Sequence, residues 1–264
     1  MGTSAAFVYS TLLFIQVLFG INFSTSKIIV EQMDPIIWSN IRFLAAGLLM
    51  LAITLISRRK HPVPSAKFFG PLIPLSILGM ALGQGLFLFG LKHTSSVNTA
   101  VLTTTIPILT LVIVVLRRQE DLTMLKLLGF ALAFTGVVLI RDLSEASFGG
   151  ANFFGDLMVF LGALCFAAYL SFGKKFLQTY DHLWVTTYMF LFSAFFMFLY
   201  NIPSLQSFNA PPMDPLFIGC AVYTVVGATL LTYFLNNMVL RQASSARVAL
   251  FIYFQPVVAG FFGW

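Results

Sequence analysis

The chain alternates between long apolar runs and short polar connections along its whole length. A helix needs about 20 mostly apolar residues to cross the hydrocarbon core of a bilayer. Nine runs approach or exceed this length, and we predict one membrane-spanning helix from each, with Lys27 ending the first. The predicted spans are about Ala5–Ser26, Pro35–Ser57, Phe68–Leu91, Ser96–Leu116, Leu122–Ile140, Phe154–Gly173, Trp184–Ile202, Pro215–Leu235 and Ala246 to the last residue.

The composition is typical of a protein whose side chains face lipid and other helices. Hydrophobic residues make up 59% of the 264 residues and charged residues only 9%, against about 25% charged residues in an ordinary soluble domain. A soluble globule needs a charged exterior. The longest connections, about Arg141–Asn152 and Pro203–Asp214, leave no room for a soluble domain. The sequence therefore predicts an all-α integral membrane protein.

The basic residues predict how the helices are oriented. The connections after the second, fourth, sixth and eighth spans hold eleven Lys and Arg residues, and those after the first, third, fifth and seventh hold three. Basic connections of membrane proteins face the cytoplasm. We therefore predict a cytoplasmic N-terminus, with Arg58 and Arg118 inside and Lys92 and Asp142 outside.

Two helical hairpins have similar sequences. Leu91–Ala100 leads into a span that contains Pro107, and Leu240–Ala249 leads into a span that contains Pro256. The offset is 149 positions in both cases. The shared proline position and the equal spacing indicate an internal repeat rather than a coincidence between two apolar hairpins.

The position of the two copies predicts their topology. Five helices separate them, an odd number, so the second copy enters the membrane from the opposite side. A looser match at 147 positions aligns Asp34 with Asp181. We predict two inverted five-helix repeats, residues 1–141 and 153–264, with the substrate site at their interface near the midplane. The second repeat contains only four visible spans, so we expect a tenth helix beyond the end of this chain.

Several short segments occur in an order and spacing typical of one transporter group. They are Gly20–Lys27, Pro35 with Arg42–Ala46, Ser96 through Pro107 to Glu120, Leu128-Gly129, Gly136–Ile140, Gly155-Asp156 and Ser245–Pro256. Together they make the chain resemble the EamA group of the drug/metabolite transporter superfamily, which includes exporters of amino acids and other metabolites. The resemblance implies ten helices in two inverted repeats in the bacterial cytoplasmic (inner) membrane. It also implies alternating access through a cavity lined by helices one, three, four, six, eight and nine.

Uncharged polar residues within the spans are candidates for substrate binding. A cavity that receives a polar solute needs hydrogen-bonding side chains that point inward. Tyr233 is the repeat counterpart of Gln84, and we expect these two side chains to face each other across the cavity. Each candidate can instead bond a neighbouring helix and only stabilise packing. The candidates are Gln16, Asn22, Gln84, Asn98, Thr103, Tyr169, Tyr233, Asn236 and Tyr253.

Small residues and prolines within the spans predict packing and kinks. Gly79 and Gly83 predict a face of close helix packing. Pro107 and Pro256 interrupt two spans and free carbonyl groups of the preceding turn, either for gating or as purely structural kinks.

Arg42 is the one ionisable residue well inside a predicted span. Charges at membrane depth are candidates for function. The position that corresponds to it in the second repeat, 147 residues later, is Met189, so the arginine is not duplicated. We expect its side chain to extend toward the membrane surface and to pair with Glu31 or Asp34.

No group of residues predicts a metal site, a cofactor or an enzyme. Cys165 and Cys220 lie inside apolar runs without the spacing of metal ligands. His61, His93 and His182 are scattered over different connections. An integral-membrane enzyme acting on lipid would need such residues clustered near one interface. We keep that enzyme and a channel as alternatives.

The favoured prediction is a secondary transporter. It would move amino acids or related zwitterionic or weakly anionic compounds as an exporter or facilitator. All carboxylates fall in connections or at helix ends, so we expect no obligatory proton coupling. The expected partners are a small-molecule substrate and the lipid bilayer, with no nucleic acid, and the expected state is a monomer.

Overall fold

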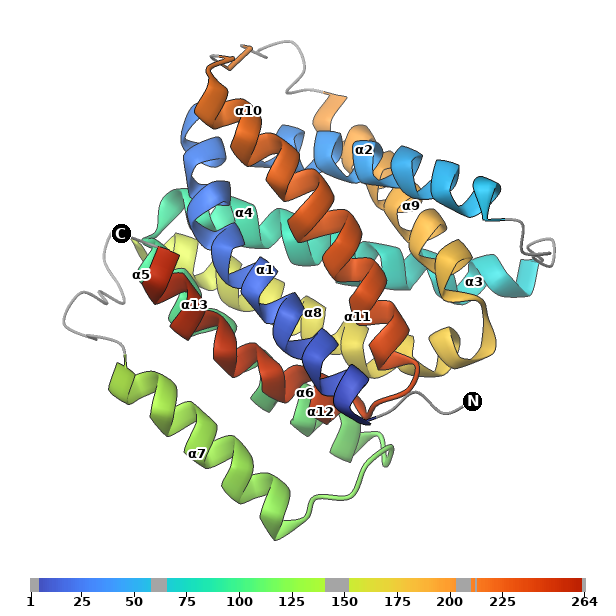
Figure 1. Ribbon diagram of the computed structural model, residues 1–264, viewed down its shortest axis with the longest axis vertical. Coiled ribbons are helices and arrows are strands. Elements are labelled where there is room, and N and C mark those ends of the chain that lie inside the picture. The colour runs from blue at the N-terminus through green and yellow to red at the C-terminus, as the bar shows by residue number, and fades with distance from the viewer. Residues whose placement is uncertain (1–4, 58–65, 141–151, 203–209, 212, 263–264) are drawn as a thin grey trace.

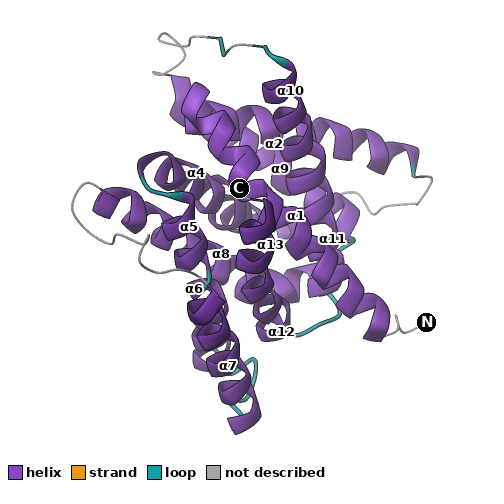
Figure 2. Cartoon of the chain, turned by 60° about the vertical axis from the view of Figure 1, so that its left-hand side comes forward, coloured by secondary structure: helices purple, strands orange, loops and turns teal. Residues whose placement is uncertain are grey.

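Every regular element in the described part of this computed structural model is a helix, as Figure 2 shows by colour. The structure describes residues 5–57, 66–140, 152–202, 210–211 and 213–262. The predicted all-helical fold is confirmed for these residues. The basic cluster Arg58–Lys60, His61, Asp142, the ends of the chain and most of the two longest connections lie outside them.

The elements include two π-helical segments, η1 and η5, and one 3-10 segment, η6. In chain order they are α1 (Ala5–Gln32), α2 (Pro35–Ile56), α3 (Ala66–Ser76), η1 (Ile77–Leu82), α4 (Gly83–His93), α5 (Ser96–Thr103), α6 (Thr105–Leu116), α7 (Met124–Ile140), α8 (Phe153–Thr179), α9 (His182–Asn201), α10 (Pro215–Val222), η5 (Tyr223–Leu231), α11 (Thr232–Leu240), α12 (Ser245–Leu250), η6 (Phe251–Phe254) and α13 (Gln255–Phe262).

Aspartate side chains cap the first turns of three helices. Asp34 accepts from the backbone N–H groups of Ile36 and Ile37 at the start of α2. Asp181 and Asp214 accept from N–H groups in the first turns of α9 and α10. These bonds satisfy donors that have no partner within a helix. Local sequence therefore decides where these helices begin.

Seven described helices are long and apolar enough to cross a membrane. Two shorter apolar helices, Met124–Gly136 and Ser245–Phe261, occupy the positions of the fifth and ninth predicted spans. Exposed leucine, isoleucine and phenylalanine side chains on the outer helices suit contact with lipid rather than water. The structure therefore supports a multi-pass membrane protein, and the count of nine spans stays a prediction.

Three predicted helix ends are wrong, and the simplest case is the eighth span, which was predicted to end at Leu235 but continues to Leu240. The first helix does not stop at Lys27 but continues to Gln32. Its lysine amine donates to the backbone carbonyls of Leu91 and Thr94 at 2.8 and 3.1 Å, so the charge is satisfied within the protein. The sixth helix runs past Gly173 to Thr179 and includes the charged residues Lys174 and Lys175. Charged residues end an apolar run but do not end a helix.

The helices run side by side in one bundle, with α1, α4, α8, α11 and α13 around its centre and α7 at one edge (Figure 1). The backbones of α4 and α8 approach closely at glycines. A Cβ atom on Gly83 would lie 3.8 Å from the Gly162 carbonyl, and one on Gly90 only 2.7 Å from the Gly155 carbonyl. Gly79 lies directly under the ring of Tyr169. The two small residues Gly79 and Gly83 thus allow close packing.

Candidate functional site

A cavity lies among α1, α4, the α5–α6 break, α8 and the η6–α13 junction. It is partly open, and the space free of protein atoms in it and in front of it amounts to about 500 Å³. Aromatic and aliphatic side chains form most of its wall, and a few amide and hydroxyl groups interrupt it. The lining residues are Phe19, Asn22, Phe23, Gly83, Gln84, Phe87, Thr103, Ile106, Gly162, Ala163, Phe166, Ile252 and Gln255.

The amide side chains on the wall differ in how many hydrogen bonds they make within the protein. Gln255 donates to Gln16 Oε1 at 2.7 Å, which joins α13 to α1. Asn22 accepts a bond of 2.9 Å from Ser26 one turn later. The Oε1 atom of Gln84 is buried and has no hydrogen-bond partner. A buried polar atom without a partner is rare in native proteins, so Gln84 has an acceptor available for a solute.

Prolines place irregular backbone at the same cavity. Pro107 has no N–H, so it cannot donate to the carbonyl of Thr103, and Pro256 likewise cannot donate to the carbonyl of Ile252. Both of these preceding residues line the cavity. The helices are irregular just before each proline, at Thr104 and in the 3-10 segment η6. The irregular backbone before each proline thus lies beside the cavity.

Tyr233 lies next to the cavity rather than on its wall. Its ring meets Phe19 and Phe166, which do line the cavity, edge-on at 6.1 and 6.2 Å between centroids. Its hydroxyl interacts with the Gln84 side chain and with Arg42 but has no hydrogen bond of normal geometry. Gln84 and Tyr233 therefore lie together at the edge of the cavity.

The prediction that Arg42 pairs with Glu31 or Asp34 is wrong. Arg42 is fully buried, and its Nε donates to Thr229 Oγ1 at 2.6 Å. Glu31 instead pairs with Lys27 at 3.9 Å, while Asp34 caps α2. The side chain turns inward because Thr229 offers it an acceptor within the bundle.

Four other candidates do not line the cavity. Tyr169 of α8 donates to Asn237 Oδ1 of α11. Tyr253 packs edge-on against Phe130 of α7. The Asn98 amide donates to Asp156 at 3.1 and 3.3 Å. Asn236 is buried and its Nδ2 has no partner. Ten of the cavity residues were not among the binding candidates: Phe19, Phe23, Gly83, Phe87, Ile106, Gly162, Ala163, Phe166, Ile252 and Gln255. Only the repeat would have indicated Phe19 and Phe166, because they lie 147 positions apart.

A buried carboxylate joins the α4–α5 turn to α8. Asp156 accepts from Thr94 Oγ1 at 2.6 Å and from the Asn98 amide. It lies in the first turn of α8, as predicted for a helix end, but it is only 7% exposed. The carboxylate therefore fastens this turn.

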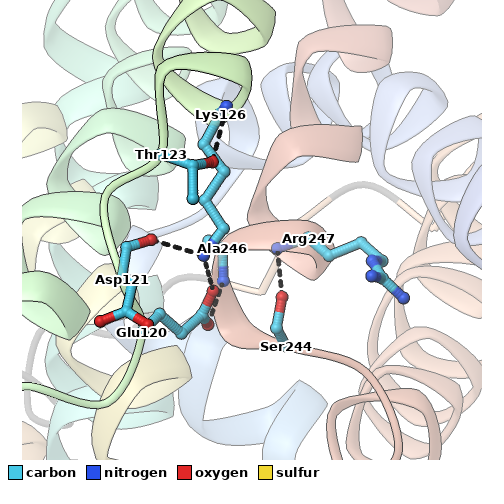
Figure 3. A network of polar contacts seen from close by, with 7 residues as sticks. All are labelled: Glu120, Asp121, Thr123, Lys126, Ser244, Ala246 and Arg247. Atoms are coloured by element: carbon cyan, nitrogen blue, oxygen red, sulfur yellow. Dashed lines mark hydrogen bonds and ion pairs between the residues drawn. The ribbon is translucent and has the colours of Figure 1, made fainter.

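A second carboxylate meets the corresponding turn before α12 (Figure 3). Glu120 accepts from the backbone N–H of Ala246 at 3.2 Å and from Lys126 at 3.1 Å. Ser244 caps the same helix by accepting from the N–H of Arg247 at 3.2 Å. In the described part of the chain, no three His, Cys, Asp or Glu side chains form a group that could hold a metal ion.

Comparison with known proteins agrees with this architecture. The model of the EamA-like transporter family matches residues 6–141 and again residues 153–264. A crystal structure of a protein with 15% sequence identity superposes over 99% of this chain and 87% of its own, with a TM-score of 0.77. That likeness shows the fold.

Curated relatives carry transporter names. The uncharacterized transporter YyaM of Bacillus subtilis is 27% identical over 262 residues, which cover 95% of this chain and 83% of the relative. An uncharacterized transporter of Archaeoglobus fulgidus is 26% identical over 240 residues, 91% of this chain and 83% of its own length. An uncharacterized inner membrane transporter of Escherichia coli, YedA, is 25% identical over 174 residues, 64% of this chain and 53% of its own. The family match spans almost the whole chain, and the protein belongs to the EamA-like transporter family of the drug/metabolite transporter superfamily.

Proposed function

We propose that the protein is a secondary transporter that moves amino acids or related zwitterionic or weakly anionic metabolites across the cytoplasmic membrane by alternating access. The observation that carries this proposal is the cavity among the helices, with an apolar wall and the polar groups of Asn22, Gln84, Thr103 and Gln255. A site of this kind binds a small solute that has an apolar body and a few hydrogen-bonding groups.

Pairs of cavity residues support the inverted repeat behind this mechanism. Phe19 and Phe166 are 147 positions apart, and Thr103 and Ile252 are 149 positions apart. All four line the cavity. An inverted repeat places its substrate site at the interface of the two halves, where equivalent residues from both halves meet. We accordingly assign residues 1–141 and 153–264 to the two halves.

The proposed orientation puts the N-terminus in the cytoplasm. Of the described basic residues, Lys67, Arg117, Arg118, Lys126, Lys174, Lys175, Arg241 and Arg247 lie near one end of the bundle. Lys27 and Lys92 lie near the other. The excess of positive charge marks the cytoplasmic end.

This orientation is tested with single cysteines in a chain that lacks Cys165 and Cys220. An impermeant thiol reagent added to intact cells should label Lys92→Cys and spare Arg118→Cys. The reverse pattern would invert the orientation.

Transport itself is tested by counterflow. The purified full chain in liposomes should exchange at least one radiolabelled amino acid or organic acid from a metabolite panel, whereas empty liposomes should not. A pH gradient that is imposed and then collapsed with an ionophore should leave accumulation of a non-titrating solute unchanged. Accumulation that follows the gradient would contradict uncoupled transport, and no exchange of any metabolite would overturn the proposal.

Removing the unpartnered amide of the cavity should slow this exchange. We expect Gln84→Leu to lower uptake roughly tenfold, which corresponds to about 1.4 kcal/mol of lost binding. Gln178→Leu is the matched control, because that glutamine lies at an exposed end of α8 and donates to the Arg241 carbonyl at 3.4 Å. Equal uptake by both variants would remove Gln84 from the substrate site.

A further inference from the structure

The guanidinium of Arg42 is a buried cation without a counterion among the described residues. Its Nε atom donates to Thr229, while both Nη atoms are buried and have no hydrogen-bond partner. Two ion pairs of the described residues, Lys27–Glu31 and Lys126–Glu120, do not involve it. An unpaired charge at membrane depth is costly, so a sequence keeps one only where it has a use.

The neighbours of this guanidinium are also unsatisfied. The Phe43 ring lies between Arg42 and Tyr233: the guanidinium carbon is 6.0 Å from its centroid and the Tyr233 ring centroid 6.4 Å from it. The Tyr233 hydroxyl has no hydrogen-bond partner of normal geometry. Gln84, whose Oε1 is unpartnered, contacts the same tyrosine and lines the cavity. Three adjacent side chains with free hydrogen-bonding atoms thus connect the cavity to a positive charge.

The second half of the chain shows that packing does not require this arginine. The repeat relates Arg42 to Met189 at 147 positions, and Thr229 to Met80 at 149 positions. Both methionines are buried in the same apolar cluster. Thr229 lies in the π-helical segment η5 and Met80 in its counterpart η1. At equivalent places in the two halves, the fold therefore accepts two methionines in one case and an arginine with a threonine in the other.

We propose that Arg42 binds the carboxylate of the transported solute, together with Tyr233 and Gln84. The inference deepens the proposed function and rests on it. Thr229 holds Nε and leaves both Nη atoms for the two oxygens of one carboxylate, the geometry in which arginine binds such groups best. The Tyr233 hydroxyl donates to the same group. Rotation of the Gln84 and Tyr233 side chains gives the carboxylate access to the Nη atoms from the cavity.

The wall of the cavity selects the rest of the solute. Phe19, Phe23, Phe87 and Phe166 offer aromatic surface, and no described carboxylate lines it. The substrate class is accordingly a carboxylate with an apolar or aromatic body, including neutral amino acids. Amines that lack a carboxylate are excluded because Arg42 repels them.

Binding is measured as the rise in unfolding temperature of the purified full chain in lipid nanodiscs. The probes are acetate, 4-methylpentanoate, 3-phenylpropionate, L-leucine and L-phenylalanine, together with 2-phenylethylamine. Each acid is compared with its amide, which is neutral for the first three acids and cationic for the two amino acids. We expect at least one apolar carboxylate to stabilise the protein, while its amide and the amine do not. Equal stabilisation by acid and amide, or no stabilisation by any acid, would overturn the proposal.

Variants assign the effect to Arg42. Arg42→Met copies the residue of the equivalent position and should fold but lose the carboxylate response. Arg42→Lys keeps the charge without the paired donors and should respond more weakly. Arg117→Met is the control, since that arginine stacks at 3.7 Å over Phe172 away from the cavity. A full response in Arg42→Met would contradict the assignment.

Tyr233→Phe gives a second, milder test. The ring keeps its contacts with Phe19, Phe43, Phe166 and Phe190. Only the hydroxyl is lost. We expect roughly tenfold weaker binding of the stabilising acid, the size of one hydrogen bond to a charged group. Unchanged affinity would remove the tyrosine from the site.

Counterflow separates this inference from the proposed function. A carboxylate that binds through Arg42 but is not exchanged across liposomes would overturn transport and leave the binding site standing. Equal exchange by wild type and Arg42→Met would overturn the carboxylate site and leave transport standing.

Discussion

The turns at Ser95 and Ser244 belong to two similar hairpins at opposite ends of the bundle (Figure 1). Each serine lies 149 positions from the other and caps the following helix by accepting a backbone N–H, from Asn98 at 3.0 Å and from Arg247 at 3.2 Å. The contacts that fasten the two turns nevertheless differ.

The first turn is held by groups that are almost fully buried. Its Thr94 and Asn98 side chains donate to Asp156, and Gly90 brings the backbone of α4 against Gly155 of α8. The second turn meets Glu120 from the connection before α7 and shares it with Lys126, whose side chain is 32% exposed. Its Ser245 donates to the Leu170 carbonyl at 2.8 Å.

Two hairpins of similar sequence are therefore not fastened equally firmly to the rest of the bundle. The repeat places Val239 and Val8 where the first end has Gly90 and Gly155, so the close glycine contact is not repeated. A buried carboxylate with several donors is worth more than a partly exposed ion pair. We therefore expect a substitution at the Asp156 end to lower the stability of the protein more than one at the Glu120 end, because each contact there contributes more.

The largest effect should come from filling the glycine contact. A Cβ on Gly90 would lie 2.7 Å from the Gly155 carbonyl and 2.8 Å from the Val159 nitrogen, both backbone atoms that cannot move aside. Gly90→Ala should destabilise the protein by about 1–3 kcal/mol, measured by thermal unfolding in detergent. Gly129→Ala is the control, since no atom lies within 4 Å of its Cβ position. An equal loss in both variants would contradict the packing argument.

An intermediate effect should separate the two carboxylates. Asp156→Asn turns an amide donor toward donors of Thr94 and Asn98 and should cost about 1.5–3 kcal/mol. Glu120→Gln weakens an ion pair to the partly exposed Lys126 and should cost about 1 kcal/mol or less. Unfolding temperatures of the two variants, compared in one detergent, check the order. The reverse order would mean that the Glu120 end is the stronger one.

The smallest difference is expected where the two turns are alike. Ser95→Ala and Ser244→Ala each remove one N-cap and should each cost about 1 kcal/mol. Because the cap geometry is the same, the two losses should agree. A marked inequality would show that the repeat does not extend to the energetics of the turns.

The sequence alone predicted the helices and their starting points. Runs of apolar residues mark the spans, and the helices of these spans start within two residues of the predicted positions. The hairpin match located the prolines that interrupt the helices beside the cavity. These features depend on neighbours in sequence, which explains why they could be read without the structure.

The tertiary structure decided which side chains face the cavity. Gln84, Asn22 and Thr103 line it, whereas Tyr253 and Asn98 point to other helices. A helix that is apolar all round has no polar face to indicate its inward side, because lipid and neighbouring helices are equally apolar. The inward turn of Arg42 depends on Thr229, a partner 187 positions away. Only the packing of distant segments supplies that acceptor, so the sequence predicted the charge at membrane depth but not its direction.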